Sequence, residues 1–170
     1  MNIAALVRDV PDFPKAGIVY KDITPVLADP AALGWIVSQI STRYRDKVDV
    51  VVGIESRGFI VGAPVAYELG LGLAVARKPG KLPAATHRVE YDLEYGTDAL
   101  EMHTDAIQPG ARVLVVDDLL ATGGTARASI DLVEKLGAEV VECAFIIELG
   151  FLGGAERLAP LGSYALLRYD

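Results

Sequence analysis

The 170-residue sequence contains a single cysteine, Cys143, and two histidines. One cysteine cannot form an internal disulfide, and without a cluster of cysteines and histidines we expect no zinc site. No apolar run approaches the roughly 20 residues that cross a membrane. Asp9 and Asp12 closely follow the first short apolar stretch, which is untypical of a signal peptide. We therefore expect a cytoplasmic protein that has no membrane segment.

Positive charge is also scarce. The chain has 16 Lys and Arg against 23 Asp and Glu, a formal net charge of −7. Proteins that bind nucleic acids non-specifically neutralise phosphates with basic side chains, so we expect no nucleic-acid partner. Charged residues make up 23% and hydrophobic residues 52%, which is too apolar for a disordered chain. At this length the composition predicts one globular domain over residues 1–170.

Apolar patterning predicts an α/β fold. Short valine-rich runs bounded by Gly, Pro or Asp predict buried strands at 48–54, 112–116 and 140–147. Apolar residues at helical spacing predict helices at 33–44, 59–69 and 126–136, the last two ending at Gly70 and Gly137. Strands that alternate with helices indicate a central, mostly parallel sheet flanked by helices.

Residues 78–101 interrupt this alternation. The stretch mixes glycine, proline, charged and aromatic residues, with too little apolar periodicity for a core element. Loops of this length in a small domain are usually functional, and many close over a site. We predict a flexible lid here; the alternative is an exposed β-hairpin without a role.

The strongest chemical signal is VLVVDDLLATGGT at 113–125, directly before the predicted helix. Asp117 and Asp118 come at the carboxyl end of a buried strand, where open α/β sheets bind ligands. Gly123 and Gly124 have no Cβ, so the main chain can approach a ligand closely. The free N–H groups and positive dipole of a helix start suit a phosphate.

The hydroxyls of Thr122 and Thr125 add further donors. Carboxylates that bind ribose hydroxyls and a turn that binds a phosphate together predict a sugar-phosphate site. No lysine follows the glycines and their order is not G-x-G-x-x-G, which excludes two common nucleotide motifs. The alternative is a solvated strand end that caps a helix, followed by an ordinary tight turn. The two parts joined in this order favour a functional site.

The segment VVDDLLATGGT resembles the 5-phosphoribosyl 1-pyrophosphate signature of the type I phosphoribosyltransferases. Similarity to the adenine-specific members of that family covers nearly the whole chain, in the blocks DFPKAGIVYKDITPVLADP, GIESRGFIVGAPVAYELG, RKPGKLP, YDLEYGTDALEMH and IIEL. The resemblance implies a small N-terminal hood that binds the base (1–30), a lid (78–101) and a homodimer. It also implies transfer of the 5-phosphoribosyl group to adenine, giving AMP and pyrophosphate, with Mg²⁺ held mainly by the substrate diphosphate.

The same resemblance assigns residues to the donor's diphosphate and to catalysis. Glu55, Ser56 and Arg57 become the pyrophosphate loop, in which Arg57 stabilises the charge of the leaving group. Further diphosphate-binding residues at the base of the lid are Arg77, Lys78 and Lys81. At the lid tip, Glu94 is expected to hydrogen-bond the base and manage its N7 proton, while Tyr95 covers the reacting centre.

The base pocket is likewise implied by the resemblance. Tyr20 occupies the place of the aromatic residue that stacks on adenine, Val19 and Lys21 supply main-chain contacts, and Leu149 closes the opposite face. The family commonly has Phe and Arg where this chain has Tyr20 and Lys21. Ala121 stands where relatives that act on 6-oxopurines usually carry an acidic residue, which favours adenine.

Two other functions stay open at this point. One is transfer to a 6-oxopurine or to orotate by an enzyme of the same type. The other is a ligand-sensing regulator that keeps the pocket and does no chemistry. A regulator usually needs a nucleic-acid surface or an added domain, and this short acidic chain has neither signal.

Overall fold

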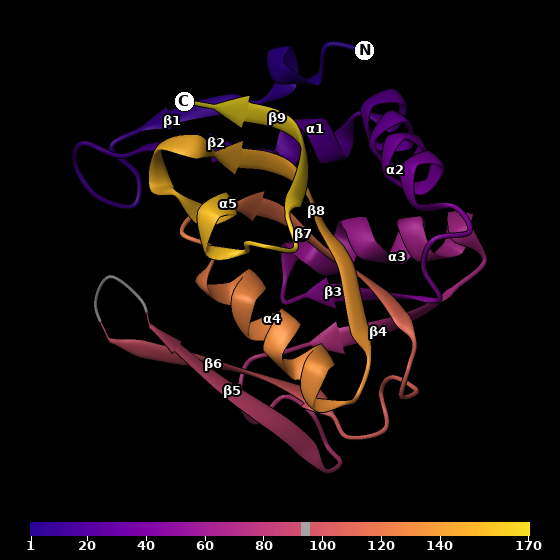
Figure 1. Ribbon diagram of the computed structural model, residues 1–170. Helices are drawn as coiled ribbons and strands as arrows, with labels where there is room; N and C mark the ends of the chain where they lie inside the picture. Colours follow the sequence, from indigo (N-terminus) through magenta and orange to yellow (C-terminus); the bar gives the residue numbers. More distant parts are fainter. Residues whose placement is uncertain (93–95) are drawn as a thin grey trace.

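The computed structural model describes residues 1–92 and 96–170 and has a five-stranded sheet at its centre (Figure 1). Its strands are β3 (Val50–Ile54), β4 (Gly72–Ala76), β7 (Arg112–Leu120), β8 (Glu139–Leu149) and β9 (Ser163–Tyr169). The order is β4-β3-β7-β8-β9, and every neighbouring pair is parallel. The predicted α/β class with a parallel sheet is confirmed, and the carboxyl ends of the strands meet at one edge.

Helices cover both faces of this sheet. They are α2 (Pro30–Tyr44), α3 (Arg57–Leu69) and α4 (Gly124–Lys135). Successive side chains of a strand face opposite sides, so Val113 and Val115 of β7 enter the core beside α4. Leu114 and Val116 enter the other core, beside α2 and α3. A strand that is apolar at every position needs cover on both faces, which explains the three-layer arrangement.

The helix ends follow local chemistry. Asp29 caps α2, because its side chain accepts a hydrogen bond from Ala32 N at 2.8 Å. The predicted end of the second helix is confirmed, since Gly70 has φ +69° and follows α3. Gly137 likewise has φ +76° just beyond α4. In both cases glycine takes a left-handed conformation that residues with a Cβ rarely adopt.

Strand boundaries differ from the sequence-based prediction. β3 begins two residues later than predicted, at Val50, whereas β7 continues past 116 to Leu120. The added pairing of β7 with β8 includes Asp117 opposite Phe145 and Leu119 opposite Ile147. Asp117 and Asp118 therefore lie inside β7, near its carboxyl end, where the strand is still hydrogen-bonded to β8. The sequence predicts an end at 116 because two consecutive acidic residues follow it.

The predicted long loop at 78–101 is wrong in one respect. Much of it forms an antiparallel pair, β5 (Thr86–Asp92) with β6 (Thr97–His103), that packs on α4 (Figure 1). Tyr91, Leu100 and Met102 of this hairpin are buried in the core, contrary to our expectation that the stretch lacks core residues. The polar residues between them obscure the apolar spacing.

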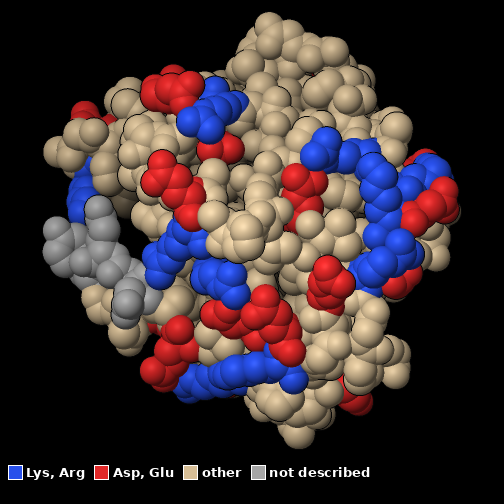
Figure 2. Space-filling view, viewed as in Figure 1, with Lys and Arg blue, Asp and Glu red and all other residues tan. Residues whose placement is uncertain are grey.

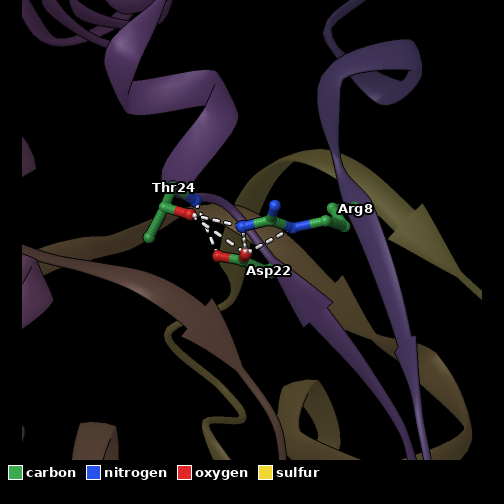
Figure 3. Close-up of polar contacts among 3 residues, drawn as sticks. All are labelled: Arg8, Asp22 and Thr24. Carbon is green, nitrogen blue, oxygen red and sulfur yellow. Dashed lines mark hydrogen bonds and ion pairs between the residues drawn. The ribbon is translucent and has the colours of Figure 1, made fainter.

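A small N-terminal hairpin and short helices complete the chain. They are η1 (Ile3–Leu6), β1 (Arg8–Pro11), β2 (Val19–Asp22), α1 (Thr24–Ala28), η2 (Gly150–Leu152) and α5 (Gly154–Arg157). Asp22 joins the hairpin to α1, because its carboxylate accepts hydrogen bonds from Arg8 Nη2 at 2.6 Å and from Thr24 N at 2.8 Å (Figure 3). Within the described residues, no helix is both long enough and apolar enough to cross a membrane.

Candidate functional site

The turn between β7 and α4 encloses a small cavity of about 80 Å³. Its lining consists of Asp117, Leu119, Leu120, Ala121, Thr122, Gly123, Gly124, Thr125, Ala126 and Phe145. Gly123 has φ +78°, and a Cβ there would lie 2.8 Å from the carbonyl oxygen of Gly154. This position therefore requires glycine both for its backbone conformation and for space. The residues predicted to bind a phosphate do come together around one cavity.

The start of α4 gives this cavity its chemical character. The helix begins at Gly124, so the first N–H groups after the turn have no partner within the helix. Together with the positive end of the helix dipole they favour an anion, and a phosphate group fits this arrangement. The hydroxyls of Thr122 and Thr125 line the same space.

A larger cavity of about 320 Å³ adjoins the first one. Its lining consists of Glu55, Ser56, Arg57, Lys78, Asp117, Asp118, Leu119, Ala121 and Thr125. Asp117, Ala121 and Thr125 belong to both linings, so the two spaces are continuous. Segments that follow β3, β4 and β7 meet here because parallel strands end at the same edge of the sheet.

The two acids differ in their surroundings. Asp118 is only 5% exposed and its Oδ2 accepts a 2.5 Å hydrogen bond from Arg57 Nε. Asp117 accepts a hydrogen bond from the backbone N of Asp118 at 2.8 Å. Burial, and next the charge of Asp118, raise the pKa of the Asp117 carboxyl group well above its ordinary value. A cation, or a ligand whose hydroxyl groups donate hydrogen bonds, would reduce the repulsion between the two carboxylates.

Arg57 begins α3 and faces the acids from the neighbouring strand. Burial is the largest single effect and opposes its charge, but the hydrogen bond to Asp118 and the nearby charges together outweigh burial, so the pKa of the guanidinium is raised. The peptide bond between Glu55 and Ser56, just before the helix, is cis. Gly58 packs directly on β7, and a Cβ there would lie 2.7 Å from the carbonyl oxygen of Val116. The close fit of α3 against β7 sets where Arg57 lies.

Glu55 organises the basic residues that follow β4. It accepts hydrogen bonds from Arg77 Nε at 3.1 Å and Arg77 Nη2 at 3.2 Å, and from Lys78 N at 2.8 Å. Burial alone would raise the pKa of Glu55, but these donors lower it, so the carboxylate stays charged. Lys81 lies farther along this loop, where its carbonyl oxygen accepts from Arg77 Nη1 at 3.3 Å.

Lys78 has two partners that the sequence did not indicate. Its ammonium group donates to the hydroxyl of Tyr91 at 2.8 Å and to the carboxylate of Asp98. Both partners lie on the β5–β6 hairpin, directly opposite each other in the strand register. The sequence could not have indicated this pairing, because Asp98 is 20 residues from Lys78 and no local spacing joins the two.

The hood residues lie at the same edge of the sheet. Lys21 Nζ pairs with Asp9 at 2.7 Å and lies 4.2 Å from the centroid of the Tyr169 ring. Tyr169 pairs with Leu149 in the sheet, which brings Leu149 close to the hood.

Tyr20 meets Phe13 edge to face, with ring centroids 5.2 Å apart, and its phenol lies near enough to Arg57 to add to the rise in that residue's pKa. The adjacent Val19 is half exposed. The two expected lid residues, Glu94 and Tyr95, lie outside the described residues.

Acidic and basic side chains alternate around the site. On the face in Figure 2, Lys and Arg side chains lie among Asp and Glu side chains. At the cavity, opposite charges meet in the pairs Arg57–Asp118, Arg77–Glu55 and Lys78–Asp98. Three of the four cations expected to bind a diphosphate, Arg57, Arg77 and Lys78, are thus held in place by a carboxylate.

Known proteins resemble this chain over nearly its whole length. The phosphoribosyl transferase domain family matches residues 22–160. An adenine phosphoribosyltransferase of Chloroflexus aurantiacus is 55% identical over 169 residues, which cover 99% of this chain and 98% of that protein.

Two solved structures are also similar. An adenine phosphoribosyltransferase from Thermoanaerobacter pseudethanolicus has a TM-score of 0.95 at 49% identity, covering 98% of each chain. The Saccharomyces cerevisiae enzyme has a TM-score of 0.93 at 36% identity, covering 97% of this chain and 96% of that one. It was crystallised with D-2,5-dideoxy-2,5-imino-altritol 1,6-bisphosphate and adenine.

Proposed function

The chain belongs to the adenine phosphoribosyltransferases, and on that premise we propose that its two joined cavities hold the phosphoribosyl donor. The reaction transfers the 5-phosphoribosyl group of 5-phosphoribosyl 1-pyrophosphate to adenine and gives AMP and pyrophosphate. One observation carries the assignment of the site. The acid pair at the end of β7 and the glycine turn onto α4 line a single continuous space.

The donor has two anionic ends, and the cavities divide between them. The 5′-phosphate would occupy the smaller cavity, where the N–H groups at the start of α4 and the hydroxyls of Thr122 and Thr125 converge. The ribose hydroxyls would donate to Asp117 and Asp118, which line the larger cavity. This leaves C1 and its diphosphate facing Arg57 and Lys78.

Partner exchange would accompany binding. Arg57 is paired with Asp118 at 2.5 Å, so the arriving diphosphate takes over the guanidinium while the ribose hydroxyls take over the carboxylate. Arg77, Lys81 and the pyrophosphate loop at Glu55 and Ser56 would add further contacts to the same group. Preformed positive groups of this kind stabilise the charge that develops on a leaving group.

Breaking the bond between C1 and oxygen builds oxocarbenium character on the ribose, as in glycosyl transfer generally. Water must be kept out, or the donor is hydrolysed before it meets the base. The lid proposed at 78–101 would close over the site at its tip, because the strands β5 and β6 are packed on α4. There Glu94 would manage the N7 proton of adenine and Tyr95 would cover the reacting centre. General acid–base assistance of this type typically accelerates a reaction about 10²–10⁴-fold.

Adenine would enter beneath the N-terminal hairpin. Tyr20 would stack on the base, the main chain at Val19 and Lys21 would contact its edge, and Leu149 would close the other side. The Lys21 side chain is already held by Asp9 and Tyr169, so a main-chain contact suits it better than a side-chain one. Ala121 offers no charge near N7, which suits adenine.

Magnesium is the proposed cofactor, and the donor groups at the site fit it. Among residues 1–92 and 96–170 no group of three or more His, Cys, Asp or Glu could hold a metal ion alone. Asp117 and Asp118 nevertheless supply carboxylate oxygens beside the diphosphate space, and Mg²⁺ commonly combines one or two carboxylates with substrate phosphates. When bound, magnesium would neutralise diphosphate charge and improve the leaving group.

Further parts of the proposal concern assembly and location. Ile60 and Tyr67 expose apolar surface on α3, and Leu73 exposes more at the start of β4, so we assign this face to a homodimer. Sedimentation at several protein concentrations would test it, and a monomer throughout would contradict it. We also propose a cytoplasmic location, with which a single buried cysteine outside any disulfide is compatible.

The test of the activity is turnover with four bases. Purified protein with magnesium and the donor should convert adenine to AMP and leave hypoxanthine, guanine and orotate nearly unchanged. Similarity over the full chain favours this result over the 6-oxopurine, orotate and regulator alternatives. Preferential turnover of a 6-oxopurine or orotate would support the second function, and no turnover of any base would support the regulator.

The test of the site is donor affinity by calorimetry. Asp118→Asn removes a charged acceptor and should weaken donor binding about tenfold or more. Asp131→Asn is the control, because Asp131 pairs with Arg127 at 2.8 Å on α4 and belongs to neither lining. Equal donor affinity of the Asp118 variant and the wild type would show that the Asp118 carboxylate does not bind the donor.

A further inference from the structure

The ammonium group of Lys78 connects the donor cavity to the lid hairpin. Lys78 follows β4 and lines the larger cavity. Its two side-chain partners lie on the hairpin, where Tyr91 of β5 is directly opposite Asp98 of β6. One side chain is therefore shared between a ligand space and an element that packs on the outer side of α4.

The two partners form a closed set with the lysine. The hydroxyl of Tyr91 accepts from Lys78 Nζ at 2.8 Å and donates to Asp98 Oδ2 at 3.2 Å, and the same Oδ2 accepts from the lysine. Asp98 Oδ1 accepts from the backbone N of Ala99 at 2.7 Å. Tyr91 is only 7% exposed, so its ring cannot move freely. Both partners are thus fixed by contacts of their own.

Charge also favours this arrangement. The hydrogen bond from Lys78 lowers the pKa of the Asp98 carboxyl group, the largest of several effects on it. Burial would lower the pKa of Lys78, but Asp98 and Tyr91 outweigh burial and raise it. The lysine is therefore charged at neutral pH although it is partly removed from water.

An ammonium group has three hydrogen-bond donors and no acceptor. Tyr91 and Asp98 engage two of them, and the third remains for a group in the cavity. We propose that Asp98 and Tyr91 are positioning residues, which hold the Lys78 ammonium at the cavity wall so that it binds the donor's diphosphate. This inference rests on the proposed function, because it assumes that the diphosphate occupies the larger cavity.

The physical gain is preorganisation. A lysine side chain has four rotatable bonds and many conformations in water, and ordering it on binding lowers affinity. Lys78 is ordered before the ligand arrives, so that cost is met in folding. The Asp98 carboxylate accepts hydrogen bonds from Lys78, the Tyr91 hydroxyl and the backbone N of Ala99. Because these donors offset its negative charge, it repels a bound anion only weakly.

A double-mutant cycle tests the inference, with magnesium pyrophosphate as the probe and calorimetry as the readout. Asp98→Asn should weaken pyrophosphate binding about fivefold, the effect of losing a partly exposed ion pair. In a Lys78→Met background the same substitution should change nothing further. Tyr91→Phe should behave in the same way with a smaller effect.

Steady-state kinetics adds a second readout. The KM for the donor should rise in Asp98→Asn while the KM for adenine stays the same, a split that a general loss of structure would not give. Glu90→Gln is the matched control, because it removes one negative charge from the same hairpin at a residue that pairs with Arg88 instead. Its affinity for pyrophosphate should equal that of the wild type.

Three results would overturn the inference. Equal weakening by Asp98→Asn in both backgrounds would mean that the residue acts through the hairpin and not through Lys78. Tighter binding by Asp98→Asn would mean that the carboxylate competes with the diphosphate. Absence of pyrophosphate binding by the wild type would refute the donor site itself, and the inference with it, whereas the first two results leave the donor site intact.

Discussion

Adding one methyl group at Gly58 tests whether the packing of α3 on β7 sets the geometry of the acid pair. Gly58 is the second residue of α3 and lies against the end of β7. A Cβ at this position would lie 2.7 Å from the carbonyl oxygen of Val116 and 3.0 Å from Asp117 Oδ1. The Val116 oxygen belongs to the backbone of a paired strand and cannot rotate away, so the helix start must move.

The size of the effect follows from these distances. The contact with Val116 is about 0.7 Å shorter than an ordinary contact of 3.4 Å. Forcing an extra methyl group into a packed core typically costs about 1–3 kcal/mol, and for a chain of this size that lowers Tm by roughly 2–10 °C. A displacement near 1 Å at a site can cost about 100-fold in rate, so we expect kcat/KM to fall about 10- to 100-fold in Gly58→Ala.

The matched control is Gly62→Ala, one turn farther along the same helix. The nearest atoms to a Cβ there are Gly53 Cα and Leu73 Cδ1, both at 3.4 Å, which is ordinary contact. Replacing a helical glycine by alanine gains up to about 1 kcal/mol in helix propensity. We therefore expect Gly62→Ala to have an equal or higher Tm and unchanged kcat/KM.

Thermal unfolding and steady-state kinetics on both variants decide the matter. Matching values of Tm and kcat/KM for the two variants would refute the reasoning. A lower Tm with unchanged kcat/KM in Gly58→Ala would show that the helix can shift without moving Arg57 or Asp117, and the claim that this packing aligns the site would then fail.

Three other measurements test charges and burial. Hydrogen bonds from Thr24 N and Arg8 lower the pKa of Asp22 from 3.8 to about 2, so its stabilisation is present above pH 3.8 and is lost as the pH falls toward 2. Asp22→Asn should therefore flatten the dependence of Tm on pH in that range, and an unchanged slope would contradict it. Burial raises the pKa of Asp117 above the ordinary value of 3.8, so ionisation of this group lowers folding stability as the pH rises above 3.8. Asp117→Asn should therefore raise Tm near neutral pH while weakening donor binding. A lower Tm would count against this reasoning. Burial raises the pKa of Cys143 to about 12. At a mildly alkaline pH the native protein should therefore be alkylated far more slowly than the unfolded protein, as measured by mass spectrometry. Equal rates would exclude a closed core around β8.

The local structure of the proposed phosphate half of the site could be predicted because its residues are contiguous. A buried strand, an acid pair, a glycine turn and a helix start follow one another over 113–125, and each part has its own local signal. The chain can satisfy those signals in few ways, since Gly123 has to adopt φ +78° for the turn to form. Local chemistry therefore determines this half of the site.

The hairpin at 86–103 could not be predicted in the same way. In β6, Ala99, Leu100 and Met102 are buried while Asp98 and Glu101 lie between or beside them. The two acids break the apolar spacing, yet both have partners that the sequence does not indicate. Asp98 binds Lys78, and Glu101 accepts from the backbone N of Gly80 at 3.0 Å.

Pairing across the site depends on the sheet and not on sequence distance. Arg57 and Asp118 are 61 residues apart, and Glu55 and Arg77 are 22 apart. They meet because β3 lies between β4 and β7, which places the three carboxyl ends side by side. No pattern along the chain carries that information, so partner choice had to come from the structure.

An acidic chain can bind an anionic donor because its field is local. The net charge of −7 would repel a diphosphate at long range, but at physiological salt the repulsion is screened within about 8 Å. At shorter range, in the site that we propose, the ligand would meet Arg57 and Lys78 across the larger cavity, each already ordered by a carboxylate. These carboxylates reduce the positive field but keep the cations in the right place. In the proposed site Arg57 would exchange Asp118 for the diphosphate, whereas Lys78 would keep Asp98 and bind through its third donor. This proposal predicts selectivity for a ribose diphosphate over a simple anion, because only a ligand with both hydroxyls and a diphosphate would satisfy Asp118 and Arg57 at once.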